Sequence, residues 1–204
     1  MNLSGFTLLC PDKKPDNISD LIDFWKNAGG YVRTIGDWWE APMLDPENVV
    51  LYGNTSFCMV LAHFYGLELS TPDNSFIATL TQDWLKREVT FHSDRDEGYQ
   101  KQEKETLEFN WKIRTFIDSK TVRCFAPYSG VYPYFPVTEF LNTFIQEHSN
   151  SLPGSMALDV GYIPGRGWAI LDVKPVWCAS PFNCEPEGMC QSLLAAHQPT
   201  KMAS

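Results

Sequence analysis

The chain has 204 residues, and its 44% hydrophobic and 14% aromatic content is enough for a sizeable core, in one domain or one unit of two small lobes. Its formal charge of −9, without any run rich in Lys or Arg, disfavours nucleic-acid binding and attachment to an anionic membrane. The absence of a signal-like N-terminus and of a ~20-residue apolar run predicts a cytoplasmic protein whose cysteines are reduced.

Residues 1–70 predict a small α/β unit. Gly29-Gly30 ends its first helix, and Thr55 or Ser56 caps its second. The turn at 53–56, Gly-Asn-Thr-Ser, leads from a strand into that second helix, and it is either an ordinary capped turn or a place where a ligand meets backbone N–H groups. The predicted elements are strands at 6–10, 31–35 and 49–52 and helices at 18–28 and 56–65.

The rest of the chain changes from helical to strand-like patterns. The polar run at 92–108 predicts a solvated loop or an exposed helix. A frayed tail is expected after His197. The other predicted elements are helices at 75–87, 136–148 and 187–196 and strands at 111–117 and 121–126.

A β-hairpin at 157–176 is the most informative pattern in the chain. A four-residue turn at 164–167, Pro-Gly-Arg-Gly, pairs Ile163 with Trp168. Because side chains alternate along a strand, one face of the hairpin is apolar and points into a core. Its members are Leu158, Val160, Leu171 and Val173.

The other face of this hairpin carries charge. In the same register Asp159 lies opposite Asp172, with Cβ atoms ~5 Å apart, and like charges at that distance are destabilising. A cation is therefore expected between them, and Gly161 leaves room beside it. The cation is either a divalent metal, which prefers carboxylate oxygens, or Lys174, which shares the face. A register shift of one residue would remove the arrangement.

Four stretches of the C-terminal half resemble the catalytic lobe of ATP-grasp proteins, specifically a clade found in bacteria and their phages. Earlier residues, 49–53 and 84–87, agree more loosely, and the resemblance covers about residues 49–196. The four stretches are Trp111–Ile117 with its hairpin Val122–Tyr128, Ala157–Gly161, Trp168–Pro175, and Val176-Trp177-Cys178 through Cys184-Glu185-Pro186.

The resemblance implies an α/β (α+β) fold of the ATP-grasp type. Its N-terminal part is a small α/β pre-ATP-grasp unit, and its C-terminal part is a mostly antiparallel sheet with packed helices. The implied division is 1–70 for the first unit, 71–110 for a shortened remnant of the nucleotide-covering lobe, 111–197 for the catalytic-type lobe and 198–204 for the tail.

The resemblance also implies ATP and Mg²⁺ as cofactors. Family members typically make an acyl phosphate from a carboxylate and ATP, and an amine or another nucleophile then displaces the phosphate. Asp159 and Asp172 fall on the strand pair that carries metal-binding acids, and Arg114 falls where a basic side chain faces phosphate or a substrate carboxylate. The implied catalytic residues are Arg114 and Lys174, and the implied cofactor-binding residues are Arg114, Lys112, Asp172, Lys174 and Trp177.

Three departures from the family pattern bear on activity. The metal strand of the family usually reads Glu-x-Asn, and here those positions are Asp172 and Lys174. Lys112 stands where the clade usually has an acidic residue. The segment 88–110 is too short and polar to build the sheet that carries a phosphate-contacting lysine in the family.

Two hypotheses follow for the function. The first is an ATP-dependent carboxylate–amine ligase, with Mg²⁺ held by Asp159 and Asp172, and with a small-molecule or peptide substrate. In a variant of this hypothesis Lys174 contacts phosphate and replaces one metal. The second is a catalytically inactive ATP-grasp descendant that binds or inhibits a protein partner, in which Lys174 neutralises the aspartates.

Overall fold

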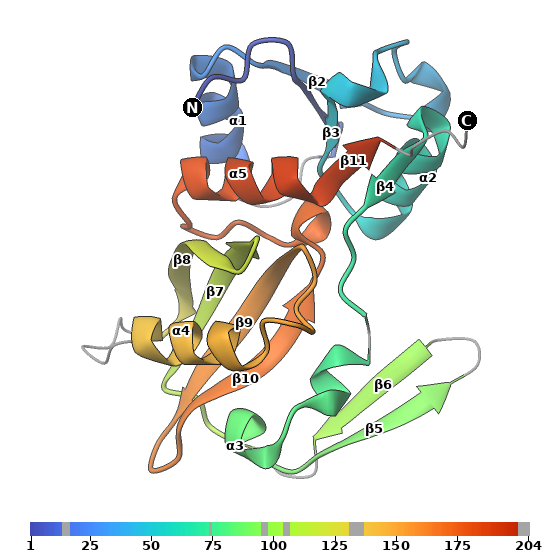
Figure 1. Ribbon diagram of the computed structural model, residues 1–204. Helices are drawn as coiled ribbons and strands as arrows, with labels where there is room; N and C mark the ends of the chain where they lie inside the picture. The colour runs from blue at the N-terminus through green and yellow to red at the C-terminus, as the bar shows by residue number, and fades with distance from the viewer. Residues whose placement is uncertain (14–16, 74, 95–97, 104–106, 131–136, 200–204) are drawn as a thin grey trace.

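The computed structural model describes residues 1–13, 17–73, 75–94, 98–103, 107–130 and 137–199, with the backbone alone at 92–94 and 98–103. Three tiers follow one another in Figure 1: a parallel sheet at the top, an antiparallel sheet in the middle and a separate hairpin below. No helix among these residues combines the length and apolar character needed to cross a membrane.

The N-terminal tier confirms the predicted α/β unit. Its three strands are parallel in the order β2-β1-β3, and α1 connects the first two. The side chain of Asn54 accepts a hydrogen bond from the Phe57 N–H at 2.9 Å and caps α2, one residue before the predicted cap. The elements are β1 (Thr7–Pro11), α1 (Ser19–Asn27), β2 (Tyr31–Ile35), η1 (Trp38–Glu40), η2 (Pro46–Asn48), β3 (Val49–Leu51) and α2 (Thr55–Tyr65).

The segment after α2 differs from the prediction at two places. The single helix expected at 75–87 is two short ones, η3 (Phe76–Thr79) and α3 (Gln82–Leu85), because the backbone is extended at Leu80 and Thr81. The polar run forms a hairpin of β5 (Val89–Asp94) and β6 (Gly98–Glu103), and not a loop or helix. Charged and amide side chains fill both faces of these strands, so the sequence lacks the apolar alternation by which strands are recognised.

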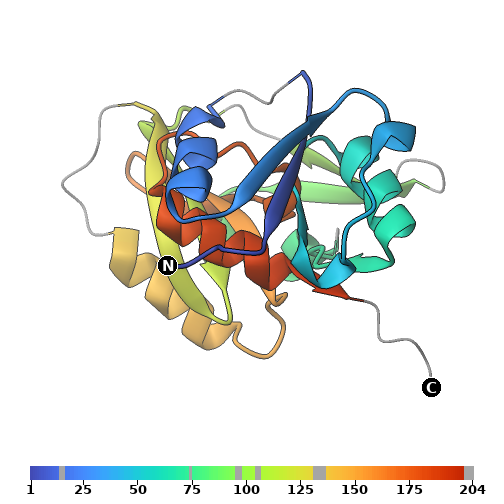
Figure 2. The ribbon, with the colours of Figure 1, turned by 90° about the horizontal axis from the view of Figure 1, so that it is seen from above.

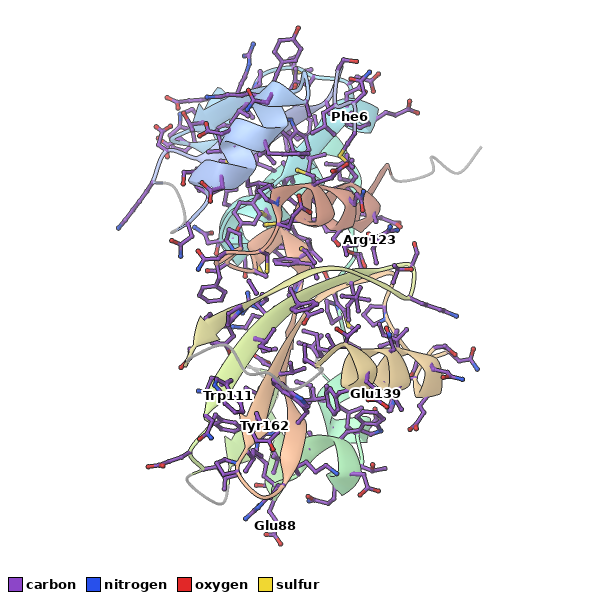
Figure 3. All side chains as sticks on the ribbon, turned by 90° about the vertical axis from the view of Figure 1, so that its left-hand side faces the viewer. Phe6, Glu88, Trp111, Arg123, Glu139 and Tyr162 are labelled. Carbon is purple, nitrogen blue, oxygen red and sulfur yellow. The ribbon has the colours of Figure 1, made fainter. Side chains whose placement is uncertain are left out.

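The middle tier is a four-stranded antiparallel sheet in the order β10-β9-β7-β8. Apolar residues of α4, among them Leu141 and Phe144, share a core with Val160 and Ile170 on one face of this sheet. Trp111 and Tyr162 mark its far end, with ring centroids 4.9 Å apart (Figure 3). The elements are β7 (Trp111–Asp118), β8 (Thr121–Ser129), α4 (Val137–Glu147), β9 (Ser155–Ile163), β10 (Gly167–Lys174) and η4 (Val176–Cys178).

Helix α5 (Pro186–Ala196) lies between the two sheets and runs beneath the N-terminal strands when seen from above (Figures 1 and 2). Its buried residues, such as Met189 and Leu193, belong to one core with Leu9 of β1 and Phe116 of β7. One continuous core therefore joins residues from the first unit and from the C-terminal lobe.

The end of the described chain is held in place and is not frayed at once. β11 (His197–Pro199) pairs with β4 (Leu67–Leu69). The Leu51 N–H donates to Nε2 of His197 at 2.9 Å, and Nδ1 of the same ring contacts the Leu193 carbonyl oxygen at 2.7 Å. Burial lowers the pKa of His197 from 6.5 to about 4, so the ring is neutral at pH 7. The rest of the predicted tail, 200–204, lies outside the described residues.

Candidate functional site

The hairpin of β9 and β10 is present, but its turn is one residue shorter than predicted. Ile163 pairs with Gly167 and not with Trp168, so the turn is the three residues 164–166. Gly165 and Gly167 have φ angles of +75° and +90°, which glycine adopts without strain.

A β-bulge at Leu171 restores the predicted pairing further along. The register of the two strands shifts between Ile170 and Asp172, and Asp172 consequently lies opposite Asp159. The bulge also turns Leu171 away from the core face that was predicted for it. A Cβ on Gly161 would lie 2.8 Å from Cδ1 of Leu171 and 2.7 Å from Cδ1 of Phe109. The space expected beside Gly161 is therefore filled by apolar side chains.

Asp159 faces Arg114 on its other side. The two residues are cross-strand partners on β9 and β7, so Asp172, Asp159 and Arg114 form a line across three strands. Arg114 donates from Nε and Nη2 to the two carboxylate oxygens of Asp159, the Nη2 distance being 2.8 Å, and from Nη1 to the Ser180 carbonyl at 3.0 Å. This bidentate pair is buried, with 3% of Arg114 and 6% of Asp159 exposed.

Asp172 is paired with Lys174, at 3.5 Å between Oδ2 and Nζ. Both side chains are open to solvent, 41% exposed for Asp172 and 44% for Lys174. We call Arg114, Asp159, Asp172 and Lys174 the ion row. The sequence predicted one shared cation, a metal or Lys174. The structure has two cations, one for each aspartate, and the pairing of Asp159 with Arg114 was missed because strand order cannot be read from a hairpin.

Two aromatic rings enclose the buried pair. The guanidinium carbon of Arg114 lies 5.1 Å from the ring centroid of Phe182 and 5.9 Å from that of Tyr128, and these rings stack at 4.6 Å. Burial opposes the charge of Arg114, but the hydrogen bonds and charge of Asp159 outweigh it and raise the pKa of the guanidinium. Burial, followed by the nearby charge of Asp159, raises the pKa of Tyr128. Both residues keep their protons at neutral pH.

Lys112 lies on the same face of β7 as Arg114, two residues away. Its ammonium is 5.1 Å from the ring centroid of Phe109, and the guanidinium carbon of Arg87 is 6.0 Å from the same ring. Arg87 is buried and donates to the Ile170 carbonyl at 2.7 Å, next to the bulge. Phe109 and Arg87 are neighbours of the site that the sequence analysis did not single out, although Arg87 ends one of the loosely matching stretches.

Trp177 does not line an open surface. It is 1% exposed, and its indole N–H donates to the Ser70 carbonyl at 3.0 Å. Its neighbour Cys178 is partly buried, which raises the pKa of the thiol, while the Thr55 hydroxyl and the charge of Lys174 lower it. The start of α2 and the end of the ion row therefore meet at Cys178.

A metal held jointly by Asp159 and Asp172 does not fit this arrangement. Both oxygens of Asp159 accept hydrogen bonds from Arg114, and the four charges of the ion row cancel in pairs. Among the described residues, no group of three or more His, Cys, Asp or Glu side chains is placed to hold a metal ion. Asp172 remains the accessible carboxylate.

A two-lobed chain with a mostly antiparallel catalytic-type sheet and charged residues on one face of it is of the ATP-grasp class. The sequence model of an ATP-grasp domain, the second family of its clade, matches residues 71–191, which is more than half of the chain. The protein belongs to this family, and the resemblance stated from its motifs is confirmed. ATP-grasp proteins generally bind ATP with Mg²⁺.

Three solved structures are similar at low identity. Macrocyclase MdnB from Microcystis aeruginosa MRC is 10% identical over 83% of this chain and 88% of its own, with a TM-score of 0.45. A RiPP-associated ATP-grasp ligase from Chryseobacterium gregarium, in complex with ADP and a leader and core peptide, is 9% identical over 85% and 89%, with a TM-score of 0.34. Cdc123 from Schizosaccharomyces pombe is 15% identical over 54% and 46%, with a TM-score of 0.33.

The chain thus spans less than half the length of Cdc123. At these identities and scores the likeness concerns architecture alone. Among proteins with curated functions, none matches this chain significantly.

Proposed function

We propose that the protein is an ATP-dependent ligase that activates a carboxylate as an acyl phosphate and transfers it to an amine or another nucleophile. The observation that carries the proposal is the ion row, in which a solvent-accessible Asp172–Lys174 pair lies beside a buried Arg114–Asp159 pair on one sheet face. Phosphoryl transfer depends chiefly on the placement of charge around phosphate oxygens. The membership in the ATP-grasp family supports the same class of reaction.

The ion row divides this work between its two halves. Lys174, with support from Lys112, contacts phosphate oxygens directly, because both ammonium groups lie on the accessible part of the face. Arg114 has hydrogen bonds from all three of its nitrogens to Asp159 and Ser180, so it serves as a fixed positive charge beneath the phosphate site. Asp159 is a positioning residue for Arg114 and no longer a proposed metal ligand.

Asp172 is the residue that would hold Mg²⁺ when the ion arrives with the nucleotide. A carboxylate is a suitable hard ligand, and Mg²⁺ typically completes its shell with water and substrate phosphates and not with an all-protein cage. When bound, the ion would neutralise charge on the phosphate oxygens.

Calorimetric titration with Mg²⁺ and a non-hydrolysable ATP analogue tests the proposal. We expect Asp172→Asn and Lys174→Met each to weaken binding about tenfold or more, since each removes an accessible charge from the phosphate site. Asp23→Asn, an equal charge change on the exposed face of α1, is the matched control and should leave binding unchanged. No binding by the unmodified protein at millimolar nucleotide would contradict the proposal.

The second candidate function is a non-catalytic binding module. The observation in its favour is that the charges of the ion row are already balanced within the protein, with Lys174 in place of an oxygen ligand. Lys174→Asn separates the two candidates. A ligase that uses the lysine loses nucleotide affinity in this variant, whereas a module whose lysine blocks the site gains Mg²⁺-dependent nucleotide binding.

The division of the chain into 1–70, 71–110 and 111–197 is kept as part of the proposal. In it, the hairpin of β5 and β6 takes the place of the nucleotide-covering lobe. Its backbone pairs Phe91 with Lys101, so a lysine does lie on a strand of this segment. Lys101 is the natural candidate for the phosphate-contacting lysine of the family.

A further inference from the structure

A cavity of about 520 Å³ opens at the carboxyl edge of the N-terminal sheet, away from the ion row. Its walls come from the ends of all three parallel strands and from the first turns of α2. Strand β1 lies in the middle, with β2 on one side and β3 on the other, so the chain changes direction at this point of the sheet. Open parallel sheets bind their ligands at such a switch point. The lining includes Asp12, Gly36, Asp37, Trp38, Asn54 and Val60.

The cavity continues into an apolar patch, which we define as Trp38, Trp39, Met43, Met59, Val60 and Phe64. Of the eight large hydrophobic side chains that are exposed among the described residues, six belong to this patch. Trp38 and Val60 line the cavity, and Phe64 follows Val60 by one helical turn on α2. The Tyr65 hydroxyl donates to the Pro42 carbonyl at 2.6 Å and holds the loop that carries Met43 against the same helix.

Exposed side chains of this size in one place mark a surface that binds something. Trp38 and Trp39 are 51% and 65% exposed, and Met43 is 89% exposed. A single small molecule in the cavity would leave Met43 and Phe64 uncovered, because they lie beyond its lining residues. An extended peptide, with one side chain in the cavity and its neighbours across the patch, would cover both parts.

The charge beside the patch is mainly negative. Asp12 and Asp37 line the cavity, and an Oε2 of Glu40 lies 3.3 Å from the position of a Cβ on Gly36, at the same edge. Lys13 is the one lysine or arginine among the described lining residues. Carboxylates next to exposed tryptophan rings suit a lysine or arginine, which both groups attract.

We propose that this cavity and patch form the docking site for a peptide that carries a large apolar side chain flanked by basic residues. The apolar side chain enters the cavity between Trp38 and Val60, and the basic residues meet Asp12, Asp37 and Glu40. This inference rests on the proposed function in one respect: the docked peptide is the recognition segment of the ligase substrate.

The cavity is connected to the ion row through the start of α2. The Gly53 N–H donates to the Trp177 carbonyl at 3.0 Å, and Cys178 lies close enough to Thr55 and Lys174 for both to lower the pKa of its thiol. The first turn of α2 thus has the cavity on one side and the exposed end of the ion row on the other. A peptide anchored in the cavity has a short route to Lys174.

Fluorescence polarisation with labelled synthetic peptides tests the proposal without nucleotide. The probe is fluorescein-Gly-Ser-Lys-Phe-Lys-Gly-amide, and its partners replace both lysines with Glu or the Phe with Gly. We expect the Lys-Phe-Lys peptide to bind at least about tenfold more tightly than either partner. Val60→Asp and the double change Asp12→Lys with Asp37→Lys should each weaken it by a similar factor, because they place the wrong charge at the anchor or remove the acidic rim.

The matched controls are Tyr31→Asp, an exposed apolar residue at the opposite end of β2, and Asp23→Lys on α1, and both should bind as the unmodified protein does. No binding of any peptide at millimolar concentration, or a preference for the Glu-Phe-Glu peptide, would overturn the proposal. So would a dimer of the chain that Val60→Asp dissociates, since the patch would then be covered by a second copy. Peptide binding without any nucleotide binding would reject the ligase proposal and leave the docking site standing, and the reverse result would do the opposite.

Discussion

The two halves of the ion row contain the same chemistry in different surroundings. Each pairs one cation with one aspartate, but Arg114–Asp159 is almost fully buried, whereas Lys174–Asp172 is more than 40% exposed. In the buried half, removing one partner leaves an uncompensated charge away from water. In the exposed half, water replaces a lost partner at little cost. The buried half therefore maintains the structure of the site, and the exposed half is free to exchange its partner for a ligand.

The largest expected effect is in the buried half. Asp159→Ala should lower the free energy of unfolding by about 3–5 kcal/mol, because the guanidinium of Arg114 remains buried without its carboxylate. Urea unfolding at pH 7 measures the loss. The double variant Arg114→Met with Asp159→Leu should recover most of it, since two apolar side chains leave no charge unpaired. A double variant as unstable as Asp159→Ala would show that the pair itself, and not the orphaned charge, accounts for the stability.

The second effect extends the comparison to a buried group that stays neutral. His197 has its pKa lowered from 6.5 to about 4, so below pH 6.5 the unfolded chain takes up a proton that the folded protein does not bind. Stability should therefore fall as the pH drops from 6.5 towards 4, by roughly 3 kcal/mol in total. Urea unfolding at several pH values, compared between the protein and His197→Gln, isolates this contribution from that of the carboxylates.

The exposed His63 provides the control for this pH dependence. His63→Asn should retain the full pH dependence, whereas His197→Gln should flatten it. Equal slopes for the protein and His197→Gln would contradict the assignment.

A smaller effect is expected where packing and not charge fills the same sheet face. Gly161→Ala places a Cβ 2.7 Å from Phe109 and 2.8 Å from Leu171, so one of these side chains must move. The expected loss is about 1–2 kcal/mol in thermal or urea unfolding. In a Phe109→Ala background the same substitution should cost clearly less, because the nearest atom is gone. An unchanged cost in that background would place the strain elsewhere.

The smallest effect on stability belongs to the exposed half. Asp172→Asn and Lys174→Met should each change the free energy of unfolding by less than about 1 kcal/mol, and added salt should reduce even that difference. The same variants are expected to give the large losses of nucleotide affinity described above. Destabilisation as great as that of Asp159→Ala would remove the distinction between the two halves.

Much of the fold could be predicted from local patterns. Apolar periodicity located α1, α2, α4 and α5 and the strands of both main sheets. It failed for β5 and β6, where polar side chains conceal the strand pattern, and for 75–87, where extended backbone at Leu80 and Thr81 divides one expected helix into two.

The candidate site was predicted in part. The opposition of Asp159 and Asp172 is confirmed, although the turn is shorter than expected and the bulge at Leu171 compensates for the difference. Trp177 was placed near the cofactor because it follows the strand of Asp172, yet it is buried in the core. Distance along the chain does not show on which side of a sheet a residue is packed.

By itself, the sequence determined the family, the hairpin and the need for positive charge beside two aspartates. These depend on residues that are close in the chain, where alternation and turn geometry act directly. Only the tertiary structure decided which cation serves which aspartate. That choice depends on β7 lying next to β9 and on Phe182 and Tyr128 covering Arg114, and so on strand order and burial, which arise from contacts between distant segments.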